Sequence, residues 1–262
     1  MKKEKYSIVL SGGGALGLAH IGVMDILKKR EEIEIKEIIG TSMGAIIAAI
    51  YAAKKENKKE EIKSISEVLK WIKYDYTTRH LIKTDKIELI LKKVFQEMKI
   101  NETEIDLKIV ATNFEEGTSY CFDKNTNITI VDAILTSMAI PGIFPEKEIN
   151  GIKYVDGYLT SNLPVKYAKE KNIITSNVIH IKNIKEIKEK VFFKKTNNLL
   201  KTQEKAFKIL ILNQEKEEIR ESLKKGHIIK ELEPDINEYK TFQFNKMDEL
   251  IIKGAEEALK KI

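Results

Sequence analysis

The fold is decided by the stretch SIVLSGGGALG at residues 7–17, together with its counterpart IIGTSMGAIIAAI at residues 38–50. In both, a short apolar run leads into a glycine-rich corner, and apolar residues at helical spacing follow the corner. A buried strand that turns directly into a helix is the building unit of α/β proteins. Two such units in succession predict neighbouring parallel strands with helices packed against the sheet.

The second corner carries a candidate nucleophile. Gly40-Thr41-Ser42-Met43-Gly44 has the Gly-x-Ser-x-Gly form, in which a tight turn aims the serine hydroxyl away from the backbone and the glycines let strand and helix approach closely. The N–H of Met43, at the start of the helix, can help to bind a negatively charged oxygen. The alternative interpretation of Ser42 is a helix N-cap between two glycines.

The first corner carries a candidate oxyanion site. Gly12, Gly13 and Gly14 are consecutive, so their backbone N–H groups can converge on one oxygen, as in the glycine-rich loops of lipases and esterases. With Gly17 the loop also fits the dinucleotide-binding pattern Gly-x-Gly-x-x-Gly. That pattern requires an acidic residue at the end of the second strand, and Glu37 lies before that end, so dinucleotide binding is disfavoured.

The remaining pattern predicts an α/β fold: a three-layer sandwich with a largely parallel central sheet flanked by helices. A Lys/Glu-rich segment at about 54–104 reads as a helical insertion or cap, in which Trp71 is expected to pack or to rim an acyl pocket. From Phe192 onward the chain is predicted to be mostly helical. Further strands are expected at 107–112, 118–122, in a hairpin at 148–155 and at 177–181; helices are expected at 16–29, 45–53, 65–72, 87–98, 128–138, 164–171 and 197–225, and from 246.

Composition limits the classes of function. The 262 residues suit one large domain or two small ones, and 46 Lys+Arg against 40 Asp+Glu give a net charge of +6 with both signs mixed. No basic stripe is interleaved with aromatic residues, which disfavours a nucleic-acid partner. Cys121 is the only cysteine, so an intrachain disulfide and a cysteine-based zinc cluster are excluded. No apolar run is long enough to span a bilayer, so we expect a cytoplasmic protein, and transient contact with a membrane surface remains open.

Three motifs in order resemble the patatin-like phospholipase family: the loop Gly12–Gly17, the corner Gly40–Gly44 and the much later pair Asp156-Gly157. The strings AHIGV at 19–23 and SMAIPGIFP at 137–145 add to the likeness, which covers about residues 5–182. The resemblance implies a single patatin-like domain over 1–262. Its core would be about 5–182, its helical insertion about 54–104 and its mainly helical C-terminal extension about 183–262.

The resemblance also implies the chemistry of a serine acyl hydrolase that cleaves phospholipid or lysophospholipid esters. Ser42 would be the nucleophile and Asp156 its base, with no metal or organic cofactor. Asp156-Gly157 alone would be read as a turn ending the hairpin. A non-catalytic lipid- or protein-binding module, and an acyltransferase with the same dyad, are the alternatives; oligomeric state stays open. The oxyanion donors would come from Gly12, Gly13, Gly14 and Met43, and the supporting glycines would be Gly17, Gly40, Gly44 and Gly157.

Some features depart from the family pattern or lie outside it. The loop has Leu16 where the family often has a basic residue, and Tyr158 follows Asp156-Gly157 where a small residue is common. Residues 182–225 hold 13 Lys+Arg and 7 Asp+Glu; we expect a helix packed on the sheet with a solvated face, and contact with anionic lipid is the alternative. The four histidines are expected to be structural or exposed: His20, His80, His180 and His227.

Overall fold

The computed structural model describes residues 3–53, 58–70, 84–179 and 195–262. Its centre is an eight-stranded sheet with strand order β5-β6-β3-β2-β1-β7-β8, and β4 pairs with β3. Trp71, His80 and His180 lie outside the described residues. The strands are β1 (Glu4–Leu10), β2 (Ile33–Thr41), β3 (Asp106–Asn113), β4 (Thr118–Phe122), β5 (Lys147–Ile149), β6 (Ile152–Asp156), β7 (Asn172–Ser176) and β8 (Ile228–Leu232).

The five strands β3, β2, β1, β7 and β8 run parallel, as expected for strand–helix units, whereas β4 and β6 run antiparallel to β3. Val110 of β3 pairs with both Thr41 of β2 and Cys121 of β4, and the next residue, Ala111, pairs with both Asp156 of β6 and Tyr120 of β4. Since β4 occupies one edge of β3, β2 and β6 share the other edge. The end of β2 therefore meets the end of β6 beside β3.

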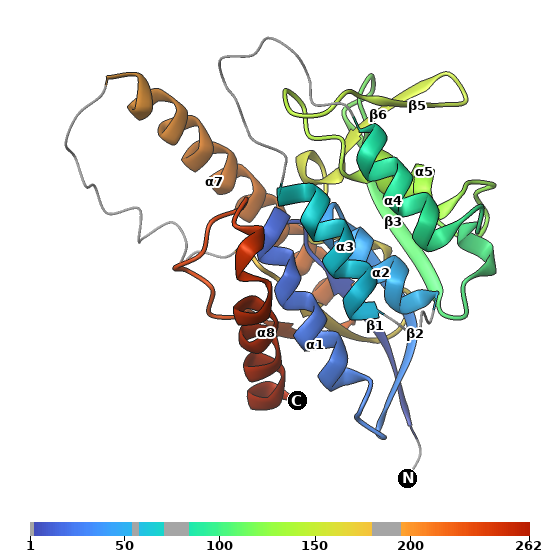
Figure 1. Ribbon diagram of the computed structural model, residues 1–262. Coiled ribbons are helices and arrows are strands. Elements are labelled where there is room, and N and C mark those ends of the chain that lie inside the picture. Colours follow the sequence, from blue (N-terminus) through green and yellow to red (C-terminus); the bar gives the residue numbers. More distant parts are fainter. Residues whose placement is uncertain (1–2, 54–57, 71–83, 180–194) are drawn as a thin grey trace.

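Helices cover both faces of the sheet (Figure 1). One face packs against an apolar core that includes α1 (Ala19–Leu27), the wholly buried α2 (Met43–Ala52), α5 (Ile130–Ser137) and α8 (Met247–Lys261). The other face carries a smaller cluster around Val9, Ile39 and Val110, which is covered by residues 163–168 and by Ile219 of α7 (Lys195–Lys224). The predicted three-layer α/β architecture is confirmed.

The segment at about 54–104 contains two helices in its described part, α3 (Lys58–Lys70) and α4 (Asp85–Phe95). A short 3₁₀ turn, η2 (Ile100–Glu102), follows them. The hairpin at 148–155 and the helices near 128–138, 197–225 and 246–262 are confirmed as β5–β6, α5, α7 and α8. Within the described ranges, no helix combines the length and the apolar character needed to cross a membrane.

Two expectations are wrong. The strand expected at 177–181 lies five residues earlier, as β7, and Asn177 ends it because its Oδ1 accepts the N–H of Ile179 at 3.0 Å. The helix expected at 164–171 is only the 3₁₀ turn η4 (Val165–Tyr167). Its continuation is prevented because the N–H of Lys169 donates to Glu37 Oε1 at 2.5 Å, and that of Glu170 donates to Ser7 Oγ at 3.1 Å.

The described chain after Phe192 is mostly helical, as expected, but it also contains the strand β8, which the sequence pattern did not indicate. This strand extends the parallel sheet by pairing with β7 from Asn172↔Ile228 to Ser176↔Leu232. Only Leu232 of β8 is fully buried, while Ile228 is 56% exposed. An edge strand of this kind carries a weak apolar alternation, so the sequence pattern does not distinguish it from a loop.

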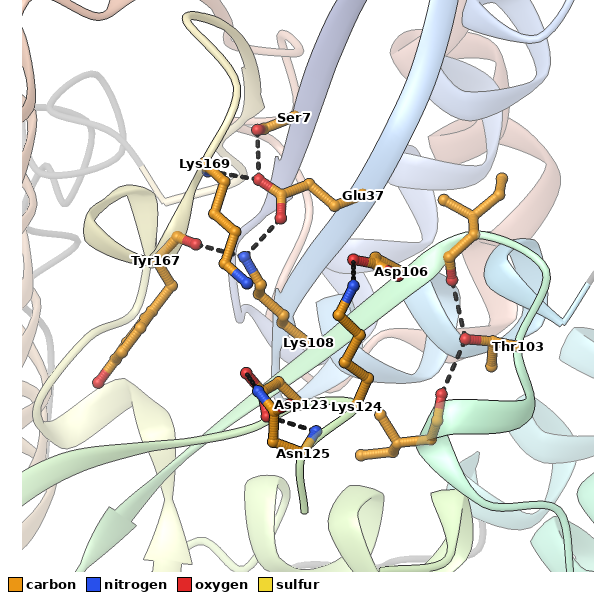
Figure 2. A network of polar contacts seen from close by, with 12 residues as sticks. Ser7, Glu37, Thr103, Asp106, Lys108, Asp123, Lys124, Asn125, Tyr167 and Lys169 are labelled. Carbon is orange, nitrogen blue, oxygen red and sulfur yellow. Dashed lines mark hydrogen bonds and ion pairs between the residues drawn. The ribbon is translucent and has the colours of Figure 1, made fainter. Parts of the chain in front are cut away.

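A buried ion pair explains why Glu37 lies within β2 and not at its end. The Glu37 carboxylate contacts the Lys108 ammonium on the neighbouring strand β3, and both side chains are almost fully buried (Figure 2). Ser7 Oγ donates to Glu37 Oε1 at 2.5 Å, and Lys108 Nζ also donates to the carbonyl of Tyr167 at 2.6 Å. Glu37 thus ties β1, β2 and β3 to the segment that precedes β7.

Candidate active site

Ser42 occupies a strained corner between β2 and α2. Its backbone angles are φ 55° and ψ −121°, a conformation that L-residues rarely adopt. The corner is tight because a Cβ added to Gly40 would collide with the backbone of Gly44, and one on Gly44 would lie 2.5 Å from the carbonyl oxygen of Leu10. Ser42 is 7% exposed and lines a cleft.

The carboxyl group of Asp156 lies beside that hydroxyl. Ser42 Oγ donates to Asp156 Oδ2 at 2.7 Å, although 114 residues separate the two. The two residues come close because β2 and β6 both pair with β3: β2 ends opposite Val110, and β6 ends opposite Ala111. The second oxygen, Oδ1, accepts the N–H of Tyr158 at 2.9 Å, which fixes the carboxyl plane. The predicted nucleophile and base are therefore in direct contact.

Burial dominates the electrostatics of Asp156. The residue has no exposed surface, and the loss of water around the carboxylate raises its pKa from 3.8 to about 7. The hydrogen bonds from Tyr158 N–H and Ser42 Oγ act in the opposite direction and lower it. A carboxyl group with a pKa near neutrality is matched to proton transfer at neutral pH.

Ser137, which the analysis of the sequence did not single out, braces the corner. Its Oγ accepts the N–H of Ser42 at 2.8 Å and donates to the carbonyl of Val110 at 2.6 Å. Thr112 adds a similar brace by donating its Oγ1 to the carbonyl of Asp156 at 2.9 Å. Ser137 belongs to the string at 137–145 noted for its resemblance, but nothing local to that string reveals contacts with residues so far away in the sequence.

The glycine loop lies against the same corner. The N–H of Gly12 donates to the carbonyl of Asn162 at 3.2 Å, so it is already engaged. Within the described parts of the chain, the N–H groups of Gly13, Gly14 and Met43 donate to no protein acceptor. These three backbone donors therefore differ from Gly12 in being available to a ligand.

The remaining glycines of the motifs allow close packing around the corner. A Cβ on Gly17 would lie 2.6 Å from Met43 Cγ, and one on Gly157 would lie 2.9 Å from Thr41 Cγ2. A Cβ on Gly12 would lie 2.5 Å from Asn162 Oδ1 and 3.3 Å from Ser42 Cβ. The glycine loop, the serine corner and the Asp156 turn are thus packed together with no room for side chains at these positions.

A small apolar cleft opens at Ser42. Phe242 is 46% exposed at this cleft, whereas Phe244 is 5% exposed. Apart from the Ser42 hydroxyl, the lining side chains are hydrocarbon or thioether groups, which suits an acyl chain. The lining residues are Gly14, Ser42, Met43, Ile46, Met138, Ile140, Phe144, Phe242 and Phe244.

The described histidines stand apart from the Ser42–Asp156 pair. His20 is fully buried, and its Nε2–H donates to the carbonyl of Ser11 at 2.9 Å while its Nδ1 accepts from Ser176 Oγ at 2.8 Å. Burial lowers its pKa to about 4, so the ring is neutral near pH 7. His227 contacts Ser222 Oγ at 2.8 Å, at the end of α7. Leu16, the departure within the loop, is buried in the core and does not line the cleft.

Comparisons with known proteins find relatives at modest identity. An uncharacterized NTE family protein of Mycobacterium tuberculosis is 29% identical over 164 residues, covering 62% of this chain and 44% of that protein. Lysophospholipase NTE1 of Candida albicans is 28% identical over 184 residues, covering 66% of this chain and 13% of that protein. Triacylglycerol lipase 4 of Saccharomyces cerevisiae is 29% identical over 221 residues, covering 67% of this chain and 23% of that protein. The chain spans less than half the length of these relatives.

Among solved structures, VipD from Legionella pneumophila aligns with a TM-score of 0.52 at 12% identity, covering 99% of this chain and 66% of that one. This likeness concerns the fold alone. The sequence model of the patatin-like phospholipases matches residues 8–169, well over half of the chain, and includes the loop, the corner and Asp156-Gly157. The chain therefore belongs to the patatin-like phospholipase family.

Proposed function

We propose that the chain is a serine acyl hydrolase that cleaves carboxylic esters of phospholipids or lysophospholipids through Ser42 and Asp156. The observation that carries this proposal is the 2.7 Å hydrogen bond from Ser42 Oγ to a buried carboxyl group whose pKa is about 7, beside an apolar cleft. An ordinary aspartate, with a pKa of about 3.9, would be a weak base at neutral pH.

The reaction proceeds in two halves. Ser42 Oγ attacks the ester carbonyl carbon while its proton passes to Asp156, and the tetrahedral oxyanion is held by the N–H groups of Gly13, Gly14 and Met43. When the C–O bond of the ester breaks, Asp156 returns the proton to the leaving alcohol, and an acyl-Ser42 ester remains. Water then attacks this ester with Asp156 as its base, which releases the carboxylic acid and restores Ser42.

The cleft supports the acyl part of the proposed substrate. Its walls of Ile46, Met138, Ile140 and Phe144 favour an aliphatic acyl chain over a polar acyl group. The relatives named lysophospholipase and triacylglycerol lipase support a lipid ester in general. The phospholipid or lysophospholipid headgroup is the finer part of the proposal.

Such substrates reside at lipid surfaces, so we include transient contact with a membrane surface in the proposal. Phe207 and Leu210, three residues apart on α7, are 51% and 63% exposed. Residues 195–210 also contain four lysines and a single glutamate. Because α7 leads into β8, which is parallel to β7, the start of α7 lies toward the edge of the sheet where Ser42 follows β2. Exposed apolar groups on a segment of lysine-rich sequence favour an anionic lipid surface.

A fluorophosphonate probe and a panel of lipid esters test the proposal. The protein is expected to be labelled on Ser42 and to release fatty acid from at least one phospholipid or lysophospholipid, and Ser42→Ala should abolish both. Ser64→Ala, which alters an exposed serine on α3, is the matched control and should keep both activities. Labelling of Ser42→Ala would reject Ser42 as the nucleophile. Formation of new esters with added alcohols, in place of free acid, would identify an acyltransferase.

A further inference from the structure

A buried carboxylate of α7 lies behind the glycine loop. Glu215 is 3% exposed and makes two hydrogen bonds: Oε1 accepts Asn162 Nδ2 at 2.8 Å, and Oε2 accepts Asn177 Nδ2 at 2.9 Å. Glu215 does not line the cleft. Neither asparagine belongs to the motifs that identify the family, yet each belongs to a segment that flanks the glycine loop.

Asn162 holds one side of the loop. Its backbone carbonyl accepts the N–H of Gly12, and its side-chain Oδ1 lies 2.5 Å from the position that a Cβ on Gly12 would take. That same Cβ position is 3.3 Å from Ser42 Cβ. Asn162 Oδ1 has no hydrogen-bond partner in the described part of the chain. Its amide is therefore oriented by Glu215, because the Nδ2 group that donates to Glu215 fixes where Oδ1 points.

Asn177 holds the other side. Its Oδ1 accepts the N–H of Ile179 at 3.0 Å, and the intervening Val178 donates its N–H to Ser11 Oγ at 3.0 Å. Val178 Cγ2 fills the space where Gly13 would carry a Cβ. The turn at 177–179 thus supports Gly13, and its first residue is anchored to Glu215.

We propose that Glu215 is a positioning residue for the glycine loop: by holding the amides of Asn162 and Asn177 in a clamp, it sets the direction in which the N–H group of Gly13 points. This role rests on the proposed acyl hydrolase function and adds a residue outside its motifs. Glu215 acts through the two asparagines and touches no reacting atom.

The chemistry of the clamp requires a carboxylate. Each asparagine amide presents N–H donors, and only a carboxylate offers an acceptor to both; a glutamine offers one acceptor and one donor. Burial raises the pKa of Glu215 to about 7, while the two amide groups lower it. A leucine or methionine would avoid that desolvation cost but would leave both asparagine amides without an acceptor.

A donor–acceptor exchange tests the proposal. In Glu215→Gln, one asparagine amide faces another amide N–H group and the clamp loses one side. In Asn177→Asp, two carboxylates face each other. In the double variant Glu215→Gln/Asn177→Asp, the amide nitrogen introduced at position 215 can donate to the carboxylate introduced at position 177, while the remaining amide oxygen at position 215 accepts from Asn162. Every hydrogen bond of the clamp is then restored, with donor and acceptor reversed on one side.

The measurements are the rate of fluorophosphonate labelling at Ser42, kcat and KM for a soluble p-nitrophenyl ester, and the thermal midpoint of each variant. Each single variant is expected to lower kcat and the labelling rate roughly 10–100-fold with KM changed less than about twofold, since misdirected oxyanion donors act on the transition state. The double variant should regain activity to within about threefold of wild type. Glu217→Gln, an exposed residue of the same helix, should match wild type.

A double variant that folds but stays as slow as Glu215→Gln would overturn the clamp, and so would wild-type kcat in Glu215→Gln. A uniform rise in KM without a fall in kcat would do the same, because it would show only weaker substrate binding. These results would not contradict the proposed acyl hydrolase function, because Ser42 of the wild-type protein would still be labelled. Failure of the wild-type protein to be labelled at Ser42 would instead overturn the hydrolase and the clamp together.

Discussion

The Oγ of Ser42 and the Oδ2 of Asp156 lie 2.7 Å apart, and the carboxyl group has no exposed surface. Ser42 directly follows strand β2 and Asp156 ends strand β6, and these two strands meet end to end along β3. The same contact that makes Asp156 a base for Ser42 also removes its carboxylate from water. Reactivity and stability at this site are therefore linked through a single pKa.

The rate of ester cleavage should depend on pH through Asp156. The base must be ionised to accept the Ser42 proton, and its pKa is about 7. We expect kcat/KM for an uncharged soluble ester to fall about tenfold per pH unit below that pKa and to level off above it. Because the pKa of Glu215 is also about 7, the profile of Glu215→Gln is the control and should keep the same midpoint. A midpoint near pH 4 would contradict the assignment.

Asp156→Asn should abolish activity and stabilise the fold at neutral pH. The pKa of Asp156 is raised from 3.8 to about 7 on folding, so the folded protein binds the extra proton between these values. Its contribution to the free energy of unfolding therefore decreases as pH rises through that window. At pH 8 the variant should be more stable by up to about 4 kcal/mol. Urea denaturation at pH 8 and at pH 4 measures this, and an equal gain at both pH values would contradict it.

The strained backbone of Ser42 gives a second stability difference at the site. Its φ of 55° with ψ of −121° suits glycine far better than any residue with a Cβ. Ser42→Gly and Ser42→Ala should both be inactive, but the glycine variant should be the more stable of the two by about 1 kcal/mol. Chemical denaturation of the two inactive variants compares them without the nucleophile as a variable. Equal stability would show that the corner stores no strain at Ser42.

Lys108 and Lys124 each form an ion pair on or near β3, one buried and one exposed, so the two can be compared (Figure 2). Lys108 is 4% exposed and contacts the buried Glu37, whereas Lys124 is 52% exposed and contacts Asp106 at 2.8 Å. Lys108→Met leaves a carboxylate buried without its counterion and should cost about 3–5 kcal/mol. Lys124→Met should cost about 1 kcal/mol or less because water screens that pair. Denaturation midpoints of both variants measure the contrast, and similar losses would contradict it.

The secondary structure around the two glycine-rich corners could be predicted from the sequence. The strands before Gly12 and Gly40, the helices after them and the hairpin at Asn150-Gly151 are all signalled by neighbouring residues, and the structure has them. The sequence pattern misplaces strand β7 because Ile179 continues the apolar run, while the turn that ends the strand depends on one hydrogen bond from the N–H of Ile179 to Asn177 Oδ1. Strand β8 was missed because an edge strand shows little apolar alternation.

The tertiary part of the candidate site was less accessible. Asp156-Gly157 alone reads as a hairpin turn, and its contact with Ser42 exists because β3 pairs with both β2 and β6. The resemblance to a family suggested Asp156, but it pointed to neither Ser137 nor Glu215. Both act through partners at least 27 residues away in the sequence. A side chain whose role depends on such contacts leaves no periodic or spacing signal.

The buried His20 predicts a specific acid sensitivity. Its pKa is lowered from 6.5 to about 4 in the folded protein, so the unfolded chain binds the extra proton between those values. The stability that this group contributes is present above pH 6.5 and is lost as pH falls toward 4, by about 3 kcal/mol in all. Asp156 and Glu215 contribute with the opposite sign over part of the same range, because their pKa values are raised.

The His20 effect must therefore be measured as a difference between two proteins that keep both acids. His20→Gln retains a side-chain donor for the Ser11 carbonyl and an acceptor for Ser176 Oγ, but it does not titrate. The free energy of unfolding of wild type minus that of His20→Gln should fall steadily from pH 6.5 to about pH 4, while the contributions of Asp156 and Glu215 cancel. Parallel stability curves for the two proteins across this range would show that His20 does not resist protonation in the fold.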